Sequence, residues 1–346
     1  MSKKVKIGNL TIGGGEKIAI QTMSVYRLSD TVNAIRTTKE LEREGCDIIR
    51  FSVLDERDAK AISQIKKDIK IPIVADIHFD YRLALSSIEN GADKIRINPG
   101  NVGGEDKLSL VAKALKESGV PVRVGSNTGS IEKEFLQKYG RNEIALGESA
   151  LKSVSILEKH GVENIVVSVK ASSVPLTVKA YEYVAKRTNY PLHLGVTEAG
   201  TEYNGVVKSS MAIGSLLLNG IGDTIRVSLS ADPKKELKAG KAILSGLNLI
   251  NEGVKIVACP TCGRCEWECM SFAQAVEDYV SGVKTPLKIA VMGCVVNGPG
   301  EAQDADLGIA GGKDCCVIFK KGEIIKKVKK EKVQEEFFKE IDKCLR

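Results

Sequence analysis

Over roughly the first 230 residues, short apolar segments alternate with amphipathic stretches, and this alternation restricts the fold more than any other feature. The apolar segments are rich in β-branched residues and predict strands, whereas stretches such as 31–45 and 105–119 have helical spacing. The expected strands are 18–23, 47–53, 71–77, 94–100, 120–126, 164–170, 192–198 and 223–229. Eight β/α units in about 250 residues are typical of a TIM barrel. An open doubly wound sheet is the alternative, but no G-x-G-x-x-G follows the first strand.

The ends of these expected strands carry an unusually polar set of side chains. In a barrel, the carboxyl ends of the strands share one face, and that face carries the active site. Arginines and a lysine from separate strands would converge there, which favours a polyanionic ligand such as phosphate or diphosphate. Any single arginine could instead form an ion pair with a neighbouring strand. The set is Gln21, Arg50, Asp76, His78, Arg96, Asn98, Arg123, Asn127, Ser168, Lys170, His193, Glu198, Arg226 and Ser228.

Two glycine-rich turns, 99–104 and 125–130, follow strands of this set and could present backbone N–H groups to phosphate oxygens. Glu198 precedes a loop that contains Gly200 and Gly205, so it is a candidate acid–base group, with a structural carboxylate as the alternative. A histidine such as His193 could equally be structural.

After residue 252 the pattern changes to a smaller α+β unit, which predicts two domains, 1–252 and 253–346. Its expected strands are 254–260, 287–295, 306–312 and 315–322, with helices at about 264–281 and 331–346. Five cysteines fall between 259 and 294. Thiolates at such short spacing indicate a metal centre rather than a disulfide framework.

Three interpretations of these cysteines remain open. A structural zinc site would need four ligands, often as two C-x-x-C pairs. Cys259, Cys262, Cys265 and Cys269 have ferredoxin spacing, but the helix expected at 264–281 would turn the last two away from a loop-held cluster. The third interpretation combines Cys259, Cys262 and Cys294 with an oxygen ligand, Glu301, from the segment that follows.

Motifs along nearly the whole chain resemble the bacterial 4-hydroxy-3-methylbut-2-enyl diphosphate synthases of the methylerythritol phosphate isoprenoid pathway. The resemblance rests on the segments 20–23, 74–85, 96–101, 167–172, 191–200, 206–210, 220–229, 258–264 and 293–302. It implies an α/β fold, a TIM (β/α)8 barrel followed by an α+β iron–sulfur domain similar to the half-domain of sulfite and nitrite reductases. It also implies a [4Fe-4S] cluster on Cys259, Cys262, Cys294 and Glu301, with Cys265 and Cys269 as spare thiols.

The implied reaction is the reductive ring opening and dehydroxylation of 2-C-methyl-D-erythritol 2,4-cyclodiphosphate, with two electrons delivered through the cluster. Catalytic roles are implied for Glu198, Glu301, Asp76 and His78. Diphosphate binding is implied for Arg50, Arg96, Arg123, Asn127, Lys170, His193, Lys208 and Ser228. The expected partners are flavodoxin or ferredoxin, with the lysine-rich segment 320–332 as a candidate dock, and a second copy of the chain that shares the active site.

Composition narrows the remaining possibilities. Residues 1–10 lack the apolar core of a secretory signal, and the longest apolar runs are too short to span a bilayer, so we expect a cytoplasmic protein without a membrane partner. Aromatic residues make up 5% of the chain, with one tryptophan, which disfavours nucleic acid as a ligand. The rival is a barrel that binds phosphorylated ligands and carries a structural zinc or RNA-binding appendage. Metal analysis would distinguish this rival from an iron–sulfur enzyme.

Overall fold

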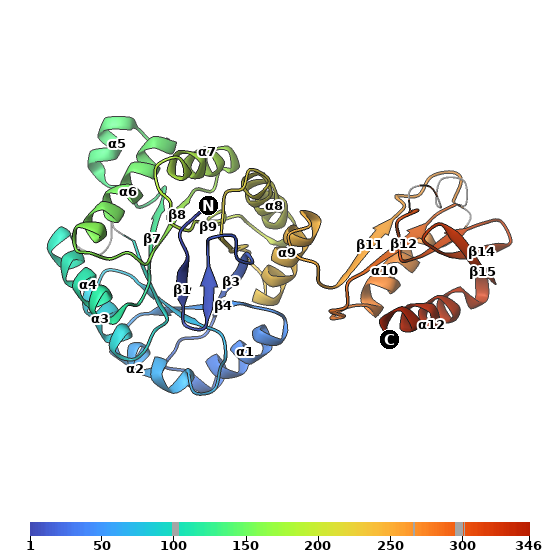
Figure 1. Ribbon diagram of the computed structural model, residues 1–346, viewed down its shortest axis with the longest axis horizontal. Helices are drawn as coiled ribbons and strands as arrows, with labels where there is room; N and C mark the ends of the chain where they lie inside the picture. The colour runs from blue at the N-terminus through green and yellow to red at the C-terminus, as the bar shows by residue number, and fades with distance from the viewer. Residues whose placement is uncertain (99–103, 266, 295–299, 301) are drawn as a thin grey trace. The chain divides into compact units, whose positions relative to one another are not determined.

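The computed structural model describes residues 1–98, 104–265, 267–294, 300 and 302–346 (Figure 1). The chain divides into two units, Met1–Ile250 and Asn251–Arg346. Within the described residues, no helix is long and apolar enough to cross a membrane.

The first unit is built on an eight-stranded parallel sheet among its described residues, in the order β8-β7-β6-β5-β4-β3-β10-β9. The strands are β3 (Ala19–Met23), β4 (Ile48–Val53), β5 (Ile73–Ile77), β6 (Lys94–Ile97), β7 (Val122–Asn127), β8 (Ile165–Lys170), β9 (His193–Leu194) and β10 (Thr224–Ile225). A parallel bridge from Val167 in β8 to Leu192, just before β9, brings the two ends of the sheet together. The predicted TIM barrel is therefore confirmed.

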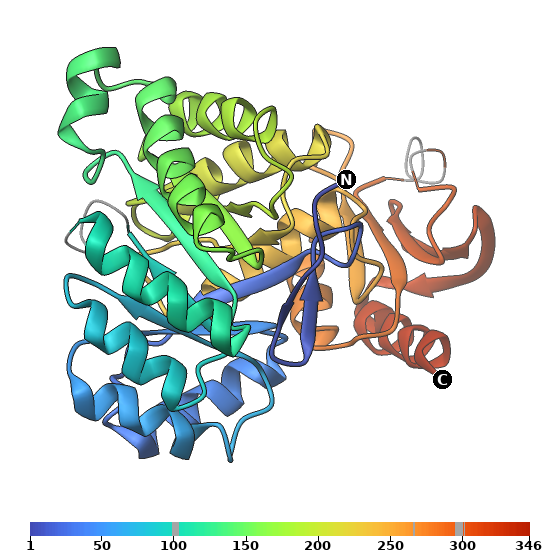
Figure 2. The same ribbon diagram turned by 60° about the vertical axis from the view of Figure 1, so that its left-hand side comes forward.

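Helices surround the strands on the outside of the barrel, as both ribbon views show (Figures 1 and 2). They are α1 (Thr31–Arg43), α2 (Glu56–Ile65), α3 (Tyr81–Glu89), α4 (Glu105–Ser118), α5 (Lys133–Tyr139), α6 (Glu143–Lys159), α7 (Val174–Ala185), α8 (Glu202–Leu218) and α9 (Pro233–Gly246). Alternate strand residues such as Ile49, Ile95 and Val124 point outward and form the main apolar core with these helices. The other half of each strand points into the barrel.

A hairpin of β1 (Val5–Ile7) and β2 (Leu10–Ile12) lies across one end of the barrel, in front of its opening in Figure 1. Its buried side chains pack against residues at the starts of strands, including Ala19, Ile48 and Val74. The hairpin was not predicted from the sequence. It closes the amino-terminal end of the barrel with apolar side chains, so the carboxyl end is the face left for a site.

Two strands are much shorter than predicted, and this corrects the placement of three candidate residues. β9 ends at Leu194 and β10 at Ile225, so Glu198, Arg226 and Ser228 lie in loops at the carboxyl end. Gly195 shows why the chain leaves the sheet here. A Cβ atom on Gly195 would stand 2.6 Å from the carbonyl oxygen of Arg226 and 2.8 Å from Lys170 Nζ. The two loops therefore cross too closely for any larger residue.

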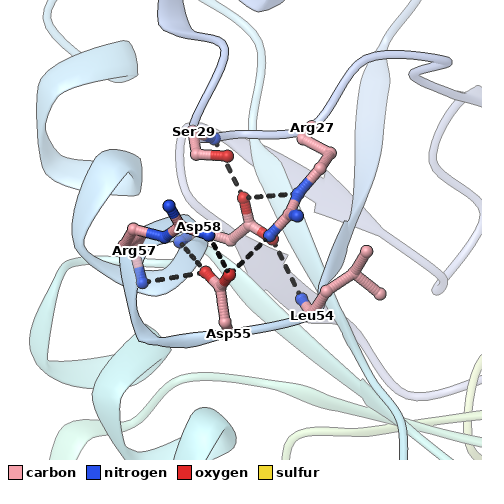
Figure 3. A network of polar contacts seen from close by, with 6 residues as sticks. All are labelled: Arg27, Ser29, Leu54, Asp55, Arg57 and Asp58. Carbon is pink, nitrogen blue, oxygen red and sulfur yellow. Dashed lines mark hydrogen bonds and ion pairs between the residues drawn. The ribbon is translucent and has the colours of Figure 1, made fainter.

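A network of charged side chains fixes the loops after β3 and β4 against α2 (Figure 3). The fully buried Asp58 receives Arg27 Nη2 at 2.8 Å and the backbone N–H groups of Ser29 at 3.0 Å and Leu54 at 3.1 Å. Asp55 caps the start of α2 and also receives Arg27 Nη2, at 2.8 Å. These bonds hold two loops of the carboxyl end in place.

The second unit is a mixed sheet in the order β11-β12-β13-β14-β15, and its described elements include helices α10 and α12. The strands are β11 (Val254–Ala258), β12 (Leu287–Met292), β13 (Leu307–Gly311), β14 (Cys315–Lys320) and β15 (Glu323–Lys329). Phe272 and Val276 of α10 (Cys269–Tyr279) and Phe337 and Ile341 of α12 (Val333–Leu345) form a core with the sheet.

One prediction for this unit is wrong, and one strand was missed. The helix expected from residue 264 begins only at Cys269, so Cys265 lies in the preceding loop, and the argument that a helix turns it away does not hold. The sequence predicted no strand in the lysine-rich segment beyond residue 322, but β15 pairs with β14 as an edge strand. Lysines on an exposed edge are a common protection against unwanted strand pairing, which explains why a strand here looks so polar.

Candidate functional site

A cavity of about 240 Å³ opens at the carboxyl end of the barrel. Eight of the residues predicted from the family resemblance line it: Arg50, Asp76, His78, Arg96, Arg123, Asn127, Lys170 and Ser228. Ser168 and Arg226 also line it, as do Met23, Ser52, Val196 and Thr197, which the sequence did not single out. Met23 and Ser52 follow from the two-residue period of β3 and β4, which could have revealed them.

Asp76 organises the cations on neighbouring strands. Its carboxylate oxygens lie 2.9 Å from Arg96 Nη1, 3.5 Å from Arg50 Nε and 3.5 Å from His78 Nε2. Burial alone would raise the pKa of Asp76, but Arg50, His78 and Arg96 hold it well below its usual range. The carboxylate is therefore ionised and orients two arginines. Gly125 leaves room for one of them, because a Cβ there would stand 3.2 Å from Arg96 Nε.

The cavity has a large excess of positive charge. Among its described lining residues, Asp76 is the single carboxylate, facing four arginines and one lysine. Several donors have no partner among the described residues, including Nε and Nη2 of Arg123 and Nε of Arg96 and Arg226. Buried polar groups are nearly always satisfied, so these donors indicate a bound anion.

Lys170 also lies among an excess of positive charge. It is buried, and burial together with Arg123, Arg226, Arg50 and Arg96 lowers the pKa of its amine well below the usual value. An anion in the cavity would reverse this effect by favouring the ammonium form.

Two further basic residues are fully buried in the barrel without lining the cavity. His193 Nδ1 lies 2.8 Å from Thr224 Oγ1, while its Nε2 has no partner within the described part of the chain. Lys94 begins β6, and its Nζ also has no partner. Burial first, and nearby cations second, lower the pKa of both groups well below their usual values. Lys94 was missed, although a lysine two residues before Arg96 on an apolar strand was a signal that could have found it.

Among the described residues, the predicted site residues Glu198 and Lys208, like His193, do not line the cavity. Glu198 is exposed and adopts a left-handed φ of 52° in the loop after β9, a conformation that non-glycine residues rarely adopt. Lys208 lies on α8, outside the cavity lining. Glu301 and most of the glycine-rich turn at 99–104 fall outside the described residues.

In the second unit, cysteines gather at the carboxyl ends of two parallel strands. Cys259 follows β11, and its N–H donates to Val291 of β12 at 2.9 Å, which places it beside the Gly293–Cys294 segment. A Cβ atom on Gly293 would stand 3.1 Å from Cys265 Sγ and 3.4 Å from Cys259 Sγ. Cys265 thus lies close to Cys259, as the ferredoxin-like interpretation requires.

Cys262 is exposed, Cys269 is buried, and all nine cysteines are present as thiols. Burial, with Cys265 and Cys259 nearby, raises the pKa of Cys269 to about 12. No group of three metal-ligating side chains is already arranged around one point within the described ranges. The donors are nonetheless soft thiolates clustered on one loop and one adjacent strand end, and this chemistry fits an iron–sulfur cluster.

Comparisons with known proteins cover both units. Residues 2–241 match the family model of the GcpE TIM-barrel domain, and residues 255–343 match that of the GcpE protein C-terminal domain. A relative from Caldanaerobacter subterraneus subsp. tengcongensis is 55% identical over all of this chain and 98% of its own length. Another from Clostridium perfringens is 52% identical over 99% of this chain and 98% of its own length. Both are named 4-hydroxy-3-methylbut-2-en-1-yl diphosphate synthase (flavodoxin).

Solved structures with a similar fold are distant in sequence. Dihydropteroate synthase from Yersinia pestis aligns with a TM-score of 0.51 and 10% identity over 72% of this chain and all of its own. The Plasmodium falciparum HPPK-DHPS protein aligns with a TM-score of 0.52 and 14% identity over 72% of this chain and 49% of its own. At this identity the likeness shows a shared barrel fold and gives no support to a pterin ligand.

Proposed function

Because this chain belongs to the GcpE family of 4-hydroxy-3-methylbut-2-en-1-yl diphosphate synthases, we propose that it makes that diphosphate from 2-C-methyl-D-erythritol 2,4-cyclodiphosphate. The chain is then an oxidoreductase of isoprenoid precursor biosynthesis. The substrate ring opens, two electrons are taken up, and one oxygen leaves as water. The rival, a phosphate-binding barrel with a zinc or RNA-binding appendage, finds no support in the names of the relatives.

The observation that carries the proposal is the group of unpaired, buried cationic donors at the barrel mouth. A cyclic diphosphate places its charged oxygens close together, which matches donors converging from several strands. Arg50 and Arg96, which Asp76 orients, would bind one side of the diphosphate. Arg123 would supply donors that have no partner among the described residues, and the buried Lys170 would add its amine.

The remaining predicted site residues of the barrel have proposed roles that follow from where they lie relative to the cavity. Asn127 and Ser228 line the cavity and would add neutral hydrogen bonds to the ligand. His78, half-exposed beside Asp76, is placed to hold or deliver a proton at the mouth. Glu198 and Lys208 would have to reach the ligand from the loop after β9 and from α8, and His193 would act from beneath the cavity.

Cys259, Cys262, Cys294 and Glu301 are proposed to hold a [4Fe-4S] cluster, and the clustering of Cys259 with the strand end at Gly293 supports this. Such a cluster supplies electrons and, where a carboxylate is its weakest ligand, a Lewis-acidic iron. Cys265 and Cys269 remain proposed as spare thiols.

We also propose flavodoxin as the electron donor, as the names of the relatives state for those proteins, with ferredoxin as the alternative. A homodimer with a shared site, a cytoplasmic location, the absence of nucleic-acid and membrane partners, and a likeness of the second unit to the sulfite and nitrite reductase half-domain all stay predictions.

Metal analysis and turnover test the proposal together. Protein purified without oxygen should hold about four irons and as much sulfide per chain, with visible absorption. It should convert the cyclic diphosphate when a strong reductant is supplied. One zinc per chain and a colourless protein would overturn the cluster assignment.

Three variants sharpen this test. Glu301→Ala should retain iron but lose turnover, and full activity would remove Glu301 from the mechanism. Cys265→Ser should retain iron while Cys294→Ser loses it. Loss of iron from Cys265→Ser would instead favour the ferredoxin-like ligand set, which its position beside Cys259 makes a real alternative.

A further inference from the structure

The second unit contains a groove of about 700 Å³ that the cluster ligands do not account for. It runs between the start of α10 and the start of α12. Its walls combine aromatic and polar side chains with one lysine, Lys330, and two glutamates, Glu268 and Glu331. Cys265, Trp267, Phe272 and Lys330 are among the residues that line it.

Trp267 joins the groove to the cysteine end of the sheet. Its indole N–H donates to the carbonyl oxygen of Met292 at 3.1 Å, one residue before Gly293. Its ring packs 5.1 Å from Phe272, centroid to centroid, and lies over Gly311, where a Cβ would stand 2.0 Å from the indole. The ring is therefore held in one place, with part of it exposed to the groove.

Cys265 completes the connection. Its thiol donates to the carbonyl oxygen of Trp267 at 3.2 Å, and its sulfur lies near Cys259. A planar ligand seated in the groove would therefore rest against side chains that directly adjoin the proposed cluster loop. Aromatic rings such as Trp267 favour stacked or edge contacts with other flat rings.

The strand register places lysines at the cysteine end of the sheet. Lys329 pairs with Cys315, and Cys316 pairs with Gly311, so the end of β15 lies at the cysteine end of the sheet. Residues 326–332 contain five lysines and one glutamate. Lys329 and Lys332 are exposed, and Lys330 lines the groove. A basic rim around a partly apolar groove attracts an acidic protein with a flat apolar group at its surface.

We propose that this groove is the electron-entry port, where a reduced flavodoxin places the exposed edge of its flavin against Trp267 and its acidic surface against Lys329, Lys330 and Lys332. The inference rests on the proposed function and names the docking site of its partner. One electron leaves the carrier's reduced flavin at each docking event. Two events supply the pair of electrons that the dehydroxylation consumes.

The single tryptophan makes the groove directly observable. Holoenzyme labelled with 5-fluorotryptophan should give one fluorine resonance, and unlabelled oxidised flavodoxin should shift it in a saturable manner. The double variant Lys329→Glu/Lys332→Glu should weaken this binding at least about tenfold at low salt. Added salt should weaken wild-type binding as well. Lys284→Glu, an exposed lysine just before β12 at the opposite end of the sheet, is the matched control and should bind like wild type.

Turnover with two reductants separates this inference from the proposed function. Reduced methyl viologen needs no docking site, so Lys329→Glu/Lys332→Glu should lose flavodoxin-driven turnover but keep viologen-driven turnover. An unmoved resonance while flavodoxin drives turnover would overturn the inference, as would binding that ignores the charge reversal. A ferredoxin that shifts the resonance where flavodoxin does not would overturn the choice of carrier. If neither reductant drives turnover of the cyclic diphosphate, the proposed function itself fails.

Discussion

Arg123 has the largest fully buried side chain among the described residues, yet two of its guanidinium nitrogens have no partner. Moving an unpaired charge out of water costs several kcal/mol, even after the protein relaxes. A structural role would normally come with a carboxylate partner. Because Arg123 lacks such a partner, its burial is better explained by an anionic ligand that supplies the negative charge when it binds.

Replacing Arg123 with methionine should therefore have opposite effects on binding and on stability. Pyrophosphate should bind about thirtyfold more weakly, because about 2 kcal/mol of charged hydrogen bonding is lost. The ligand-free protein should be as stable as wild type or more so, because a desolvated charge is removed. Calorimetric titration and urea unfolding measure the two quantities.

Arg82→Met is the control for this substitution, since Arg82 is an exposed residue paired with Asp80. Arg82→Met should change neither the free energy of pyrophosphate binding nor the free energy of unfolding by more than a few tenths of a kcal/mol. A ligand-free Arg123→Met protein that is destabilised by 3 kcal/mol or more would show that Arg123 is structural.

His193 predicts a pH dependence of stability. Burial and neighbouring cations lower its folded-state pKa well below the usual value, while the unfolded chain keeps a pKa near 6.5. As pH falls below about 6.5, the unfolded state binds a proton that the folded state refuses, so stability falls by up to about 1.4 kcal/mol per pH unit. Urea unfolding between pH 7 and pH 5.5 should show this slope.

The His193→Gln variant should lack most of that slope, and His160→Gln, at an exposed position, should retain it. Equal slopes in wild type and His193→Gln would mean that folding leaves the pKa of His193 unchanged, which would contradict the prediction. The groups that face His193 are Thr224 and the basic side chains Lys170, Arg123, Lys94 and Arg50, so no described carboxylate offsets the effect.

At the scale of single elements, the loops at the carboxyl end depend on buried hydrogen bonds more than on helix capping. Asp58→Asn should destabilise the protein by about 2–3 kcal/mol, because asparagine cannot accept every bond that the buried carboxylate receives. Asp55→Asn should cost less than about 1 kcal/mol, since asparagine also caps helices well. Thermal or urea unfolding of the pair tests this, and equal losses would contradict the assigned difference.

The sequence predicted the existence of each barrel strand but not where the last two end. Hydrophobic periodicity identifies a buried strand, whereas the exits of β9 and β10 are set by close approach of Gly195 to Arg226, which only the folded chain reveals. The β1–β2 hairpin was missed because its strands are three residues long. β15 was missed because an exposed edge strand carries lysines where periodicity expects apolar residues.

The site residues also divide into those that the sequence predicts and those that only the folded chain reveals. Arg50, Arg96, Arg123 and Lys170 were predictable because inward-facing positions at the strand ends follow from a two-residue period. The orienting role of Asp76 depends on the strand register that places it opposite Arg96 and Ser52, and this register is a tertiary property. The position of Cys265 beside Cys259 depends on a helix start that the sequence placed five residues too early.

At the scale of the whole molecule, the proposed reaction needs groups from both units. The anion cavity lies wholly in Met1–Ile250, and the clustered cysteines lie wholly in Asn251–Arg346. Each unit has its own apolar core. A substrate held by the first unit must therefore meet the second unit of the same chain or that of a partner chain.

Mixing two inactive variants decides between these arrangements. At substrate concentrations below its weakened dissociation constant, Arg123→Met should disable the barrel, and Cys259→Ser should disable the cluster, each leaving the other unit intact. In a homodimer with a shared site, a mixed dimer has one site built from two damaged units and one built from two intact units. Random exchange gives half mixed dimers, so about a quarter of wild-type turnover should return. If each chain completes its own site, every site in every dimer carries one damaged unit. No activity should then return at any mixing ratio, and the shared-site proposal would be wrong.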